Sequence, residues 1–528
     1  MLFLLVVLMA IPARAQLPGT KLDDGLAGAE GHAAIFVRMS DQVFPKGGDY
    51  ERFCAKQRDD VDRLELRGQI VEQLRLKSKR SYAGLRDRLD ELVSAGEIKS
   101  IQRYWIVNGF ACEATAKACQ TLAEMPGVGF VYRQRFTSQH QTARQAAAFD
   151  GTPLVAMYGK WMSDRKDLKR KPVDPVGMKT PWNIKAVGVD RAWAKHGVTG
   201  RGVVVAVLDD GMMAVPTLTP SLWHNPKETL NGKDDDGNGY VDDVFGYNFA
   251  SNHPYCVTPV GHRHGTLCAG IITAQPTPGE DPLATGIAPN AKVMPLVGSG
   301  KLLAYEYALE NGADVLSMSY TFEPAAMGQY RGLFRTAHEH LSAAGVVSVG
   351  GAGNYATRRP VGLEIGSPKD IPCVIAAAGI RDNGEVPPFS SRGPVSWSGI
   401  RYFDAYDRKH PQLSKPDVTA CNGGFPMWTR EEVWVGRRAG KLKETVYKDD
   451  AGYLLATGPQ GNSFAGPHAA GVAALMLEAN PKLPVWQLKR IMEATCKDMG
   501  EAGRDTTHGA GMLQADKAVE AVIRERNK

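Results

Sequence analysis

The chain has 528 residues, of which 43% are hydrophobic and 23% charged. This length is too great for one compact domain, and this composition excludes a wholly disordered chain, a fibrous repeat and a protein with many membrane spans. The formal net charge of +6 is small for the size, so we expect no nucleic-acid partner. Eight cysteines are too few for a disulfide scaffold and lack the paired C-x-x-C spacing of zinc sites.

The chain opens with an apolar run at residues 2–11. The run is too short to cross a bilayer, which takes about 20 residues. Ala13-Arg14-Ala15 follows it and fits a cleavage site for signal peptidase. We therefore interpret residues 1–15 as a secretory signal peptide and expect a secreted or periplasmic protein with no membrane segment in its mature form. The alternative, the buried start of a domain, does not explain the cleavage motif.

Sequence patterns typical of strands and of helices alternate in the next part of the chain. The apolar pattern predicts strands over residues 34–37, 104–107 and 129–132, and helices over residues 64–92 and 113–125. We assign residues 31–136 to a small α+β domain. Residues 137–180 are rich in Gln, Lys, Arg and Pro without apolar periodicity, which is typical of a linker or a processing zone.

Short apolar runs alternate with helical stretches in residues 181–528. The runs lie at residues 203–208, 313–318, 346–349 and 374–378, and the helical stretches include residues 333–344 and 469–479. Continuous apolar strands interleaved with helices predict a parallel sheet buried on both faces, and therefore a doubly wound α/β domain. Sites in such domains form at the carboxyl ends of the strands.

Three segments place reactive side chains in distinctive surroundings. Asp209 ends the first apolar run, where a carboxylate is unfavourable unless something pairs with it. His264 enters a helix of small residues, and Ser463 opens another. The chain order Asp, His, Ser is that of the subtilisin triad and differs from the orders in chymotrypsin and the α/β-hydrolases. Ala465 also breaks the G-x-S-x-G motif of the hydrolases.

These segments resemble the signature blocks D-[STD]-G, H-G-T and G-x-S-x-x-x-P-H of the subtilisin-like serine peptidases. Residues 286–293, 311–315, 389–394 and 415–418 are similar to further stretches of that family, and the resemblance extends over about residues 182–522. It implies a subtilisin-like fold and a serine endopeptidase that works through an acyl-enzyme. The doubled aspartate at 209 and 210 and the sequence Cys268-Ala269-Gly270 are similar to the kexin and furin branch, whereas the general layout resembles secreted bacterial subtilases.

The resemblance gives each triad residue a role. Ser463 would be the nucleophile, which needs a base within about 2.6–3.2 Å. His264 would be that base, and Asp209 would hold the imidazole in the correct tautomer. A helix N-cap is the alternative role for Ser463.

Three residues compete with this assignment. Asp210 is the rival carboxylate, but the family motif puts the functional one first. His468 stands where the family has a structural histidine, and we interpret His262 as a loop residue.

The resemblance also implies an oxyanion hole and a substrate cleft. Asn354 would complete the hole together with the backbone N–H of Ser463, although a turn-forming asparagine is the alternative. The expected substrate-binding residues are Ser319, Tyr320, Thr321, Gly351, Ala352 and Gly353. Many relatives have glycine where Thr321 stands, so we expect a cleft of altered shape.

An acidic loop at residues 234–243 predicts a structural Ca²⁺ site, because its ligands are hard oxygens. The loop is only partly similar to an EF-type loop, since position twelve is Phe245 instead of glutamate. Closure would have to come from Asp242 or Asp243, and an acidic solvated turn is the alternative. The candidate ligands are Asp234, Asp236, Asn238, Tyr240, Asp242 and Asp243.

The first domain resembles the propeptides of the same peptidases, on the strength of residues 105–110 and 126–131. The resemblance implies a folding assistant and temporary inhibitor, and a sheet of non-local strand pairs folds slowly enough to benefit from one. We expect a self-processing zymogen that is cut within residues 134–181, with Lys169-Arg170-Lys171 as one candidate, and a monomer. Cys112 and Cys119 could pair within this domain.

Two hypotheses remain for the whole chain. In the first, it is an active endopeptidase that acts on proteins or peptides. In the second, it is a catalytically weak subtilase-like binding protein whose cleft is blocked by residues 320–322 and by the long segment 418–461, which contains a charged, hairpin-like stretch.

Overall fold

The computed structural model describes residues 20–57, 61–134, 152–163, 172–258, 264–275, 285–410, 413–430, 444–448 and 453–527. The expected signal peptide, residues 169–171 and His262 lie outside these ranges. None of the helices within them combines the length and the hydropathy that crossing a bilayer requires.

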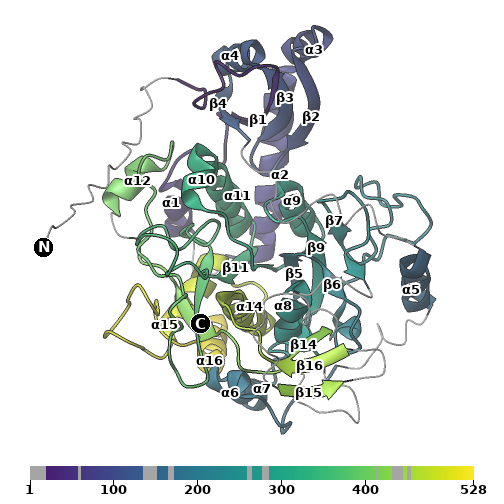
Figure 1. Cartoon of the computed structure of the whole chain (residues 1–528), viewed down its shortest axis with the longest axis vertical. Coiled ribbons are helices and arrows are strands. Elements are labelled where there is room, and N and C mark those ends of the chain that lie inside the picture. Colours follow the sequence, from purple (N-terminus) through teal and green to yellow (C-terminus); the bar gives the residue numbers. More distant parts are fainter. Residues whose placement is uncertain are drawn as a thin grey trace, which may run out of the picture.

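Residues 20–134 form an α+β unit whose sheet lies at one end of the molecule (Figure 1). Its antiparallel sheet has the order β2-β3-β1-β4. The strands are β1 (His32–Met39), β2 (Ile98–Tyr104), β3 (Gly109–Thr115) and β4 (Val128–Arg133). The helices are α1 (Asp49–Lys56), α2 (Arg63–Ala83), α3 (Arg86–Ser94) and α4 (Ala116–Glu124).

The prediction of a strand over residues 104–107 is wrong, because the chain turns after Tyr104, where β2 ends. The N–H of Asn108 donates to the carbonyl of Trp105 at 3.2 Å, and Asn108 has a φ of 39°. Ile106 and Val107 are fully buried in a cluster that includes side chains from the larger domain. Their apolar character therefore reflects docking onto that domain and not a place in the sheet.

The helix expected over residues 113–125 is shorter than predicted. β3 continues through Thr115, and α4 begins only at Ala116. The hydroxyl of Thr115 accepts a hydrogen bond from the N–H of Ala118 at 3.2 Å, so this residue caps the helix.

The rest of the chain is built on a seven-stranded parallel sheet with the order β13-β12-β11-β10-β5-β9-β7. Its strands are β5 (Val204–Asp209), β7 (Tyr247–Asn248), β9 (Lys292–Val297), β10 (Val315–Met318), β11 (Val347–Gly351), β12 (Ile375–Ile380) and β13 (Val418–Cys421). A two-stranded pair, β6 (Met212–Met213) and β8 (Val257–Thr258), lies beside it.

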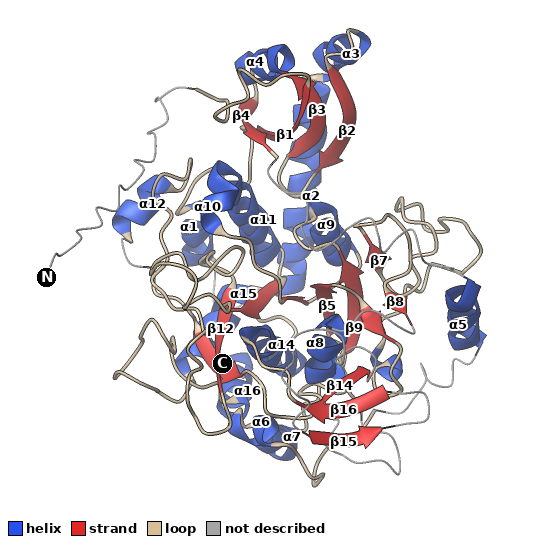
Figure 2. Cartoon of the chain, in the orientation of Figure 1, coloured by secondary structure: helices blue, strands red, loops and turns tan. Residues whose placement is uncertain are grey.

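Helices cover both faces of this sheet, which confirms the predicted doubly wound α/β fold (Figure 2). Val205 and Val207 of β5 pack into one core cluster, and Ala206 and Leu208 into the other, as the two-residue period of a strand requires. One cluster contains α7 (Val189–His196), α8 (His264–Thr273), α14 (Asn462–Ala479), α15 (Val485–Ala494) and α16 (Ala515–Arg526); the other contains α9 (Leu302–Glu310) and α11 (Arg331–Ala343). The remaining helices are α5 (Thr152–Ser163), α6 (Trp182–Ala186), α10 (Pro324–Met327) and α12 (Asp404–Lys409), with 3-10 turns η1 (Thr219–Ser221) and η3 (Gly328–Tyr330).

The long segment 418–461 contributes a three-stranded antiparallel sheet in the order β14-β16-β15. These strands are β14 (Met427–Arg430), β15 (Glu444–Lys448) and β16 (Tyr453–Thr457). Trp428 of β14 is buried, and a Cβ placed on Gly270 of α8 would lie 3.9 Å from its ring. This sheet therefore packs against the helix that begins at His264.

Glycines allow α8 and α14 to approach the sheet closely. A Cβ on Gly351 would lie 1.8 Å from the carbonyl oxygen of Asn462, and one on Gly466 would lie 2.6 Å from the backbone nitrogen of Gly351. A Cβ on Gly265 would lie 2.0 Å from the carbonyl oxygen of Gly211. The starts of both helices are thus fixed against the carboxyl ends of strands.

We expect Gly351→Ala to lower the free energy of unfolding by about 1–3 kcal/mol, because the added methyl group has no room beside α14. Thermal unfolding of the full chain measures this effect as a lower Tm. Gly68→Ala is the control, since a Cβ there meets nothing within 4 Å and alanine favours the helix. Equal Tm values for Gly351→Ala and the unsubstituted chain would contradict the close packing.

Candidate active site

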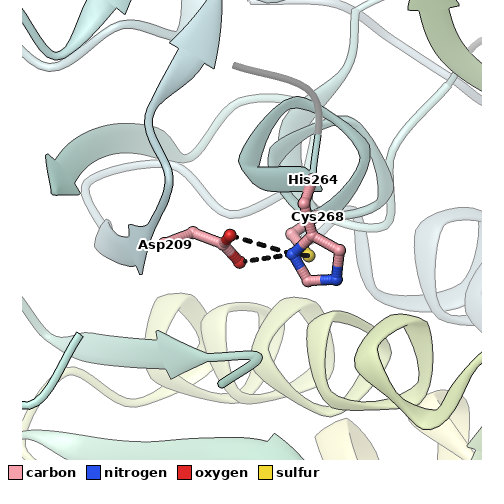
Figure 3. Close-up of side chains that lie close together, drawn as sticks. All are labelled: Asp209, His264 and Cys268. Atoms are coloured by element: carbon pink, nitrogen blue, oxygen red, sulfur yellow. Dashed lines mark hydrogen bonds and ion pairs between the residues drawn. The ribbon is translucent and has the colours of Figure 1, made fainter. Parts of the chain in front are cut away.

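Asp209 and His264 form a hydrogen-bonded pair where β5 ends and α8 begins. The Nδ1 of His264 lies 2.9 and 2.8 Å from the two carboxylate oxygens of Asp209 (Figure 3). The Asp209 side chain is 9% exposed and the His264 side chain 35% exposed, so the pair opens to solvent on the histidine side. Nδ1 donates to the carboxylate, which leaves Nε2, on the side of the ring away from Asp209, free to accept a proton.

Mutual attraction sets the ionisation of this pair. Desolvation alone would raise the pKa of Asp209 and lower that of His264. The attraction between the two side chains outweighs it in both, so the pKa of Asp209 is lowered and the pKa of His264 is raised well above its usual value. Asp209 is therefore ionised and orients the ring.

Asp210 has a different task. Its Oδ1 accepts a hydrogen bond from the N–H of Gly265 at 2.9 Å, at the first turn of α8. Desolvation and the charge of Asp209 raise the pKa of Asp210 to about 6. Asp209 thus binds the imidazole of His264, whereas Asp210 binds the backbone of α8, the helix that begins at His264.

Ser463 lies beside this pair, in the first turn of α14. The thiol of Cys268 lies 4.0 Å from Nδ1 of His264 and 3.7 Å from the carbonyl oxygen of Ser463, so it packs between them. The Ser463 hydroxyl donates to the carbonyl of Ser319 at 3.4 Å, and the Ser319 hydroxyl donates to the carbonyl of Ser463 at 2.8 Å. No hydrogen bond among the described residues joins the Ser463 hydroxyl to His264. The Ser463 hydroxyl is bound to Ser319 instead.

His468 cannot serve as the base. It is fully buried, its Nδ1 donates to the carbonyl of Phe464 at 2.7 Å, and its Nε2 accepts from the amide of Asn183 at 3.0 Å. Burial lowers its pKa to about 4. Both ring nitrogens are occupied, and the ring stays neutral inside the fold.

The carboxamide of Asn354 lies at the start of α14. Its Oδ1 accepts from the N–H of Asn462 at 2.8 Å, and its Nδ2 would lie 3.3 Å from a Cβ on Gly461. The oxygen is therefore committed to the residue before Ser463, and the amide N–H groups are the part of the side chain that can donate to a ligand.

The expected substrate-binding residues fall into two groups. Gly351, Ala352 and Gly353 are buried, and the carbonyl of Gly353 accepts from the N–H of Ser391 at 3.0 Å. Ser319, Tyr320 and Thr321 are half-buried. The second group continues into Phe322, which exchanges backbone hydrogen bonds of 2.9 and 3.0 Å with Ser367, so the end of this segment is held by Ser367.

The acidic loop gathers a different set of carboxylates from the one expected. Glu228, Asp236 and Asp243 bring ligand oxygens within 4.8 Å of one another. Glu228 and Asp243 are 2% and 0% exposed, and burial raises the pKa of both. The amides of Asn225 and Asn238 donate to Asp243 at 3.2 and 3.0 Å.

The other predicted ligands hold the loop's backbone. Asp234 accepts from the N–H groups of Gly237 and Gly239 at 2.8 and 2.7 Å, and Asp242 accepts from those of Asn231 and Gly232 at 2.8 and 2.9 Å. Tyr240 packs its ring against Tyr247 with centroids 4.8 Å apart. The sequence reasoning missed Glu228, because it precedes the acidic run and matches no loop spacing.

The disulfide that the sequence allowed between Cys112 and Cys119 is not formed. Both are buried free thiols, and burial raises the pKa of Cys112 to about 12 and that of Cys119 to about 11.

Residues 200–511 match the model of the Subtilase family. The chain belongs to this family. The predicted family and fold are therefore confirmed.

Several bacterial proteases are similar to this subtilase. It is 24% identical to Bacillopeptidase F of Bacillus subtilis (strain 168), over 86% of this chain and 29% of that protein. It is 26% identical to a calcium-dependent protease of Nostoc sp., over 66% of this chain and 50% of that protein. The crystal structure of fervidolysin from Fervidobacterium pennivorans, described as a keratinolytic enzyme related to subtilisin, has the same fold, with a TM-score of 0.54 and 20% identity over 95% of this chain and 62% of that one. The chain spans half or less of the length of the two relatives compared by sequence.

The pairing with Asp209 predicts the titration of His264. We expect its imidazole to titrate above the usual pKa of 6.5 in the full chain. In Asp209→Asn the opposing charge is gone while desolvation remains, so the pKa should fall below 6.5. NMR of the ring nitrogens measures both values, with His468 as an internal control that titrates near 4 in either protein. A His264 pKa that Asp209→Asn leaves unchanged would show that the carboxylate does not set it.

Proposed function

We propose that this subtilase is a secreted serine endopeptidase that hydrolyses peptide bonds of proteins through an acyl-enzyme, with Asp209, His264 and Ser463 as its triad. The proposal is based mainly on the ionised Asp209, which accepts a hydrogen bond from Nδ1 of His264. Ser463, at the start of α14, lies beside this pair. Relatives named as proteases support it.

The geometry suggests how each residue acts. His264 takes the proton of Ser463 as its oxygen attacks the substrate carbonyl, and then returns it to the leaving amine. Asn354 Nδ2 and the N–H of Ser463 donate to the oxyanion, and losing one such donor reduces turnover about a hundred- to a thousandfold. Because only neutral His264 can accept a proton and its pKa is raised, the rate should keep rising with pH above 6.5, the usual pKa of histidine.

A fluorophosphonate probe tests the proposed function. We expect it to label the processed protein at Ser463, and Ser463→Ala to remove the label. Ser319→Ala is the matched control, because it leaves the nucleophile in place. Processed protein that folds but takes no label would support the catalytically weak binding protein instead.

We also propose that residues 20–134 act as a propeptide, a folding assistant and temporary inhibitor that is removed by self-processing in the linker. Contacts with the larger domain support this role. The N–H of Ile106 donates to Glu306 at 2.9 Å, and His340 Nδ1 lies 2.5 Å from the carbonyl of Ile106. Arg63 donates to Asp314 at 2.9 Å.

Docking of this domain should weaken as the pH rises. Burial raises the pKa of Glu306 to about 8, so the docked carboxyl is protonated at neutral pH. A raised pKa contributes stability that is complete below the ordinary value of 4.5 and is lost as the pH rises through 8. In Ser463→Ala, hydrogen exchange at Ile106, corrected for its intrinsic pH dependence, should therefore lose protection progressively between pH 4.5 and 8 and level off above pH 8.

Glu306→Gln tests the cause, because glutamine can still accept from Ile106 but does not ionise. Protection in this variant should stay constant between pH 4.5 and 8, whereas Glu323→Gln, at an exposed position, should behave like the parent. The same loss of protection in all three proteins would exclude Glu306 as the titrating group.

We further propose that Glu228, Asp236 and Asp243 hold a structural Ca²⁺ ion. The residues fit the ion: the three carboxylates are crowded and partly buried, and Glu228 Oε2 is a buried oxygen with no hydrogen-bond partner. Bound calcium would neutralise these like charges and fix the loop. Calcium dependence in the names of two relatives agrees with this reading.

Calcium should raise the Tm of the full chain, and chelation should lower it. Glu228→Gln should abolish most of this response, because it removes a ligand charge. Asp242→Asn should retain it, since asparagine can still accept from Asn231 and Gly232. A calcium response that survives Glu228→Gln but disappears in Asp242→Asn would favour the ligand set expected from the sequence.

A further inference from the structure

Lys369 is a buried cation directly beneath the expected substrate cleft. Its side chain is 0% exposed. Its ammonium donates to the carbonyl of Tyr320, and its methylene stem lies against Gly350, where an added Cβ would lie 2.7 Å from Lys369 Cδ. The side chain therefore touches both segments that border the nucleophile, residues 319–322 and the end of β11.

No carboxylate in the described ranges forms an ion pair with this ammonium. The neighbouring Asp370 is committed to Arg331 at 2.6 Å and to the hydroxyl of Ser367 at 2.8 Å. By contrast, the buried Lys415 pairs with Asp417 at 2.6 Å. A buried ammonium without a counter-ion is unfavourable, which is why such groups are found where a ligand supplies one.

The electrostatic surroundings leave the charge incompletely compensated. Desolvation lowers the pKa of Lys369 to about 7, Asp370 and the more distant Asp209 oppose that shift, and Arg359 adds to it. His338, on α11, is itself held neutral by burial and by Lys369. An ammonium has three donors, and Tyr320 accepts only one of them.

The position of Lys369 relative to Ser463 identifies the substrate residue that it would meet. The Ser463 hydroxyl contacts the carbonyl of Ser319, the residue before Tyr320, and Asn354 follows β11 by three residues. We place the substrate residue that supplies the attacked carbonyl between these two segments, both of which Lys369 contacts.

We propose that Lys369 is a specificity-determining residue that favours an aspartate or glutamate at the substrate position supplying the attacked carbonyl. The substrate carboxylate provides the counter-ion that the fold lacks, through a charge-assisted hydrogen bond. The inference rests on the proposed peptidase function.

Paired peptides test it. Two substrates that differ only in Glu or Gln at that position have nearly the same shape, so the ratio of their kcat/KM values, measured below pH 7 where Lys369 carries its charge, reports that charge. We expect the processed enzyme to prefer the Glu peptide about tenfold or more, since hydrogen bonds to charged groups are strong. Lys369→Met should bring the ratio close to one, and Lys369→Arg should restore part of it.

Lys292→Met is the matched control, because this lysine is also desolvated and donates to a backbone carbonyl, that of Pro220 at 2.8 Å. It should keep the preference of the parent. A Glu-to-Gln ratio of kcat/KM near one in the unsubstituted enzyme would overturn the proposal, even if Lys369→Met fails to fold. A preference for the Glu peptide that survives in a folded Lys369→Met would also overturn it. Fluorophosphonate labelling of Ser463 separates the cases: a labelled enzyme without the preference refutes the role of Lys369 alone, whereas an unlabelled one refutes the peptidase function.

Discussion

The approach of α14 to β11 is the constraint on which the rest of the structure depends. The carbonyl of Asn462 occupies the space where any side chain at position 351 would begin, and Gly466 meets the backbone of Gly351 one turn later. Because β11, β10 and β5 are neighbours in the sheet, this contact brings Ser463 close to the end of β10 and, across it, to Asp209. The second close contact, of Gly265 with Gly211, sets His264 against the same edge.

The distribution of buried charge separates structural groups from functional ones. Asp417 is surrounded by Lys415, Lys489 and Arg504, with distances of 2.6, 2.6 and 3.2 Å, and this compensated cluster holds β13 to the C-terminal helices. Two other groups have no such partner among the residues that the structure describes. No Lys or Arg there pairs with Glu228, Asp236 or Asp243, and no carboxylate there pairs with the ammonium of Lys369. Each uncompensated charge is opposite in sign to the ligand proposed for it, calcium in one case and an acidic side chain in the other.

Much of this arrangement could be predicted from the sequence, because it is encoded locally. Continuous apolar runs gave the buried parallel strands, and small residues after His264 and Ser463 indicated helices that pack closely. Features that depend on distant parts of the chain could not be predicted. Ile106 and Val107 resembled a strand because docking buries them. Glu228 joins the acidic loop only after folding, and nothing in the sequence shows that Arg331 pairs with Asp370 while the adjacent Lys369 is turned toward Tyr320.

The most direct test of the account is a crystal structure of the processed enzyme after reaction with a fluorophosphonate. We predict a phosphorus atom bonded to Ser463 Oγ, with one phosphoryl oxygen on Asn354 Nδ2 and the N–H of Ser463, and with His264 Nε2 turned toward the adduct while Nδ1 stays on Asp209. Phosphorus on any other residue, or a Ser463 hydroxyl still bound to Ser319 and distant from the imidazole, would contradict the account.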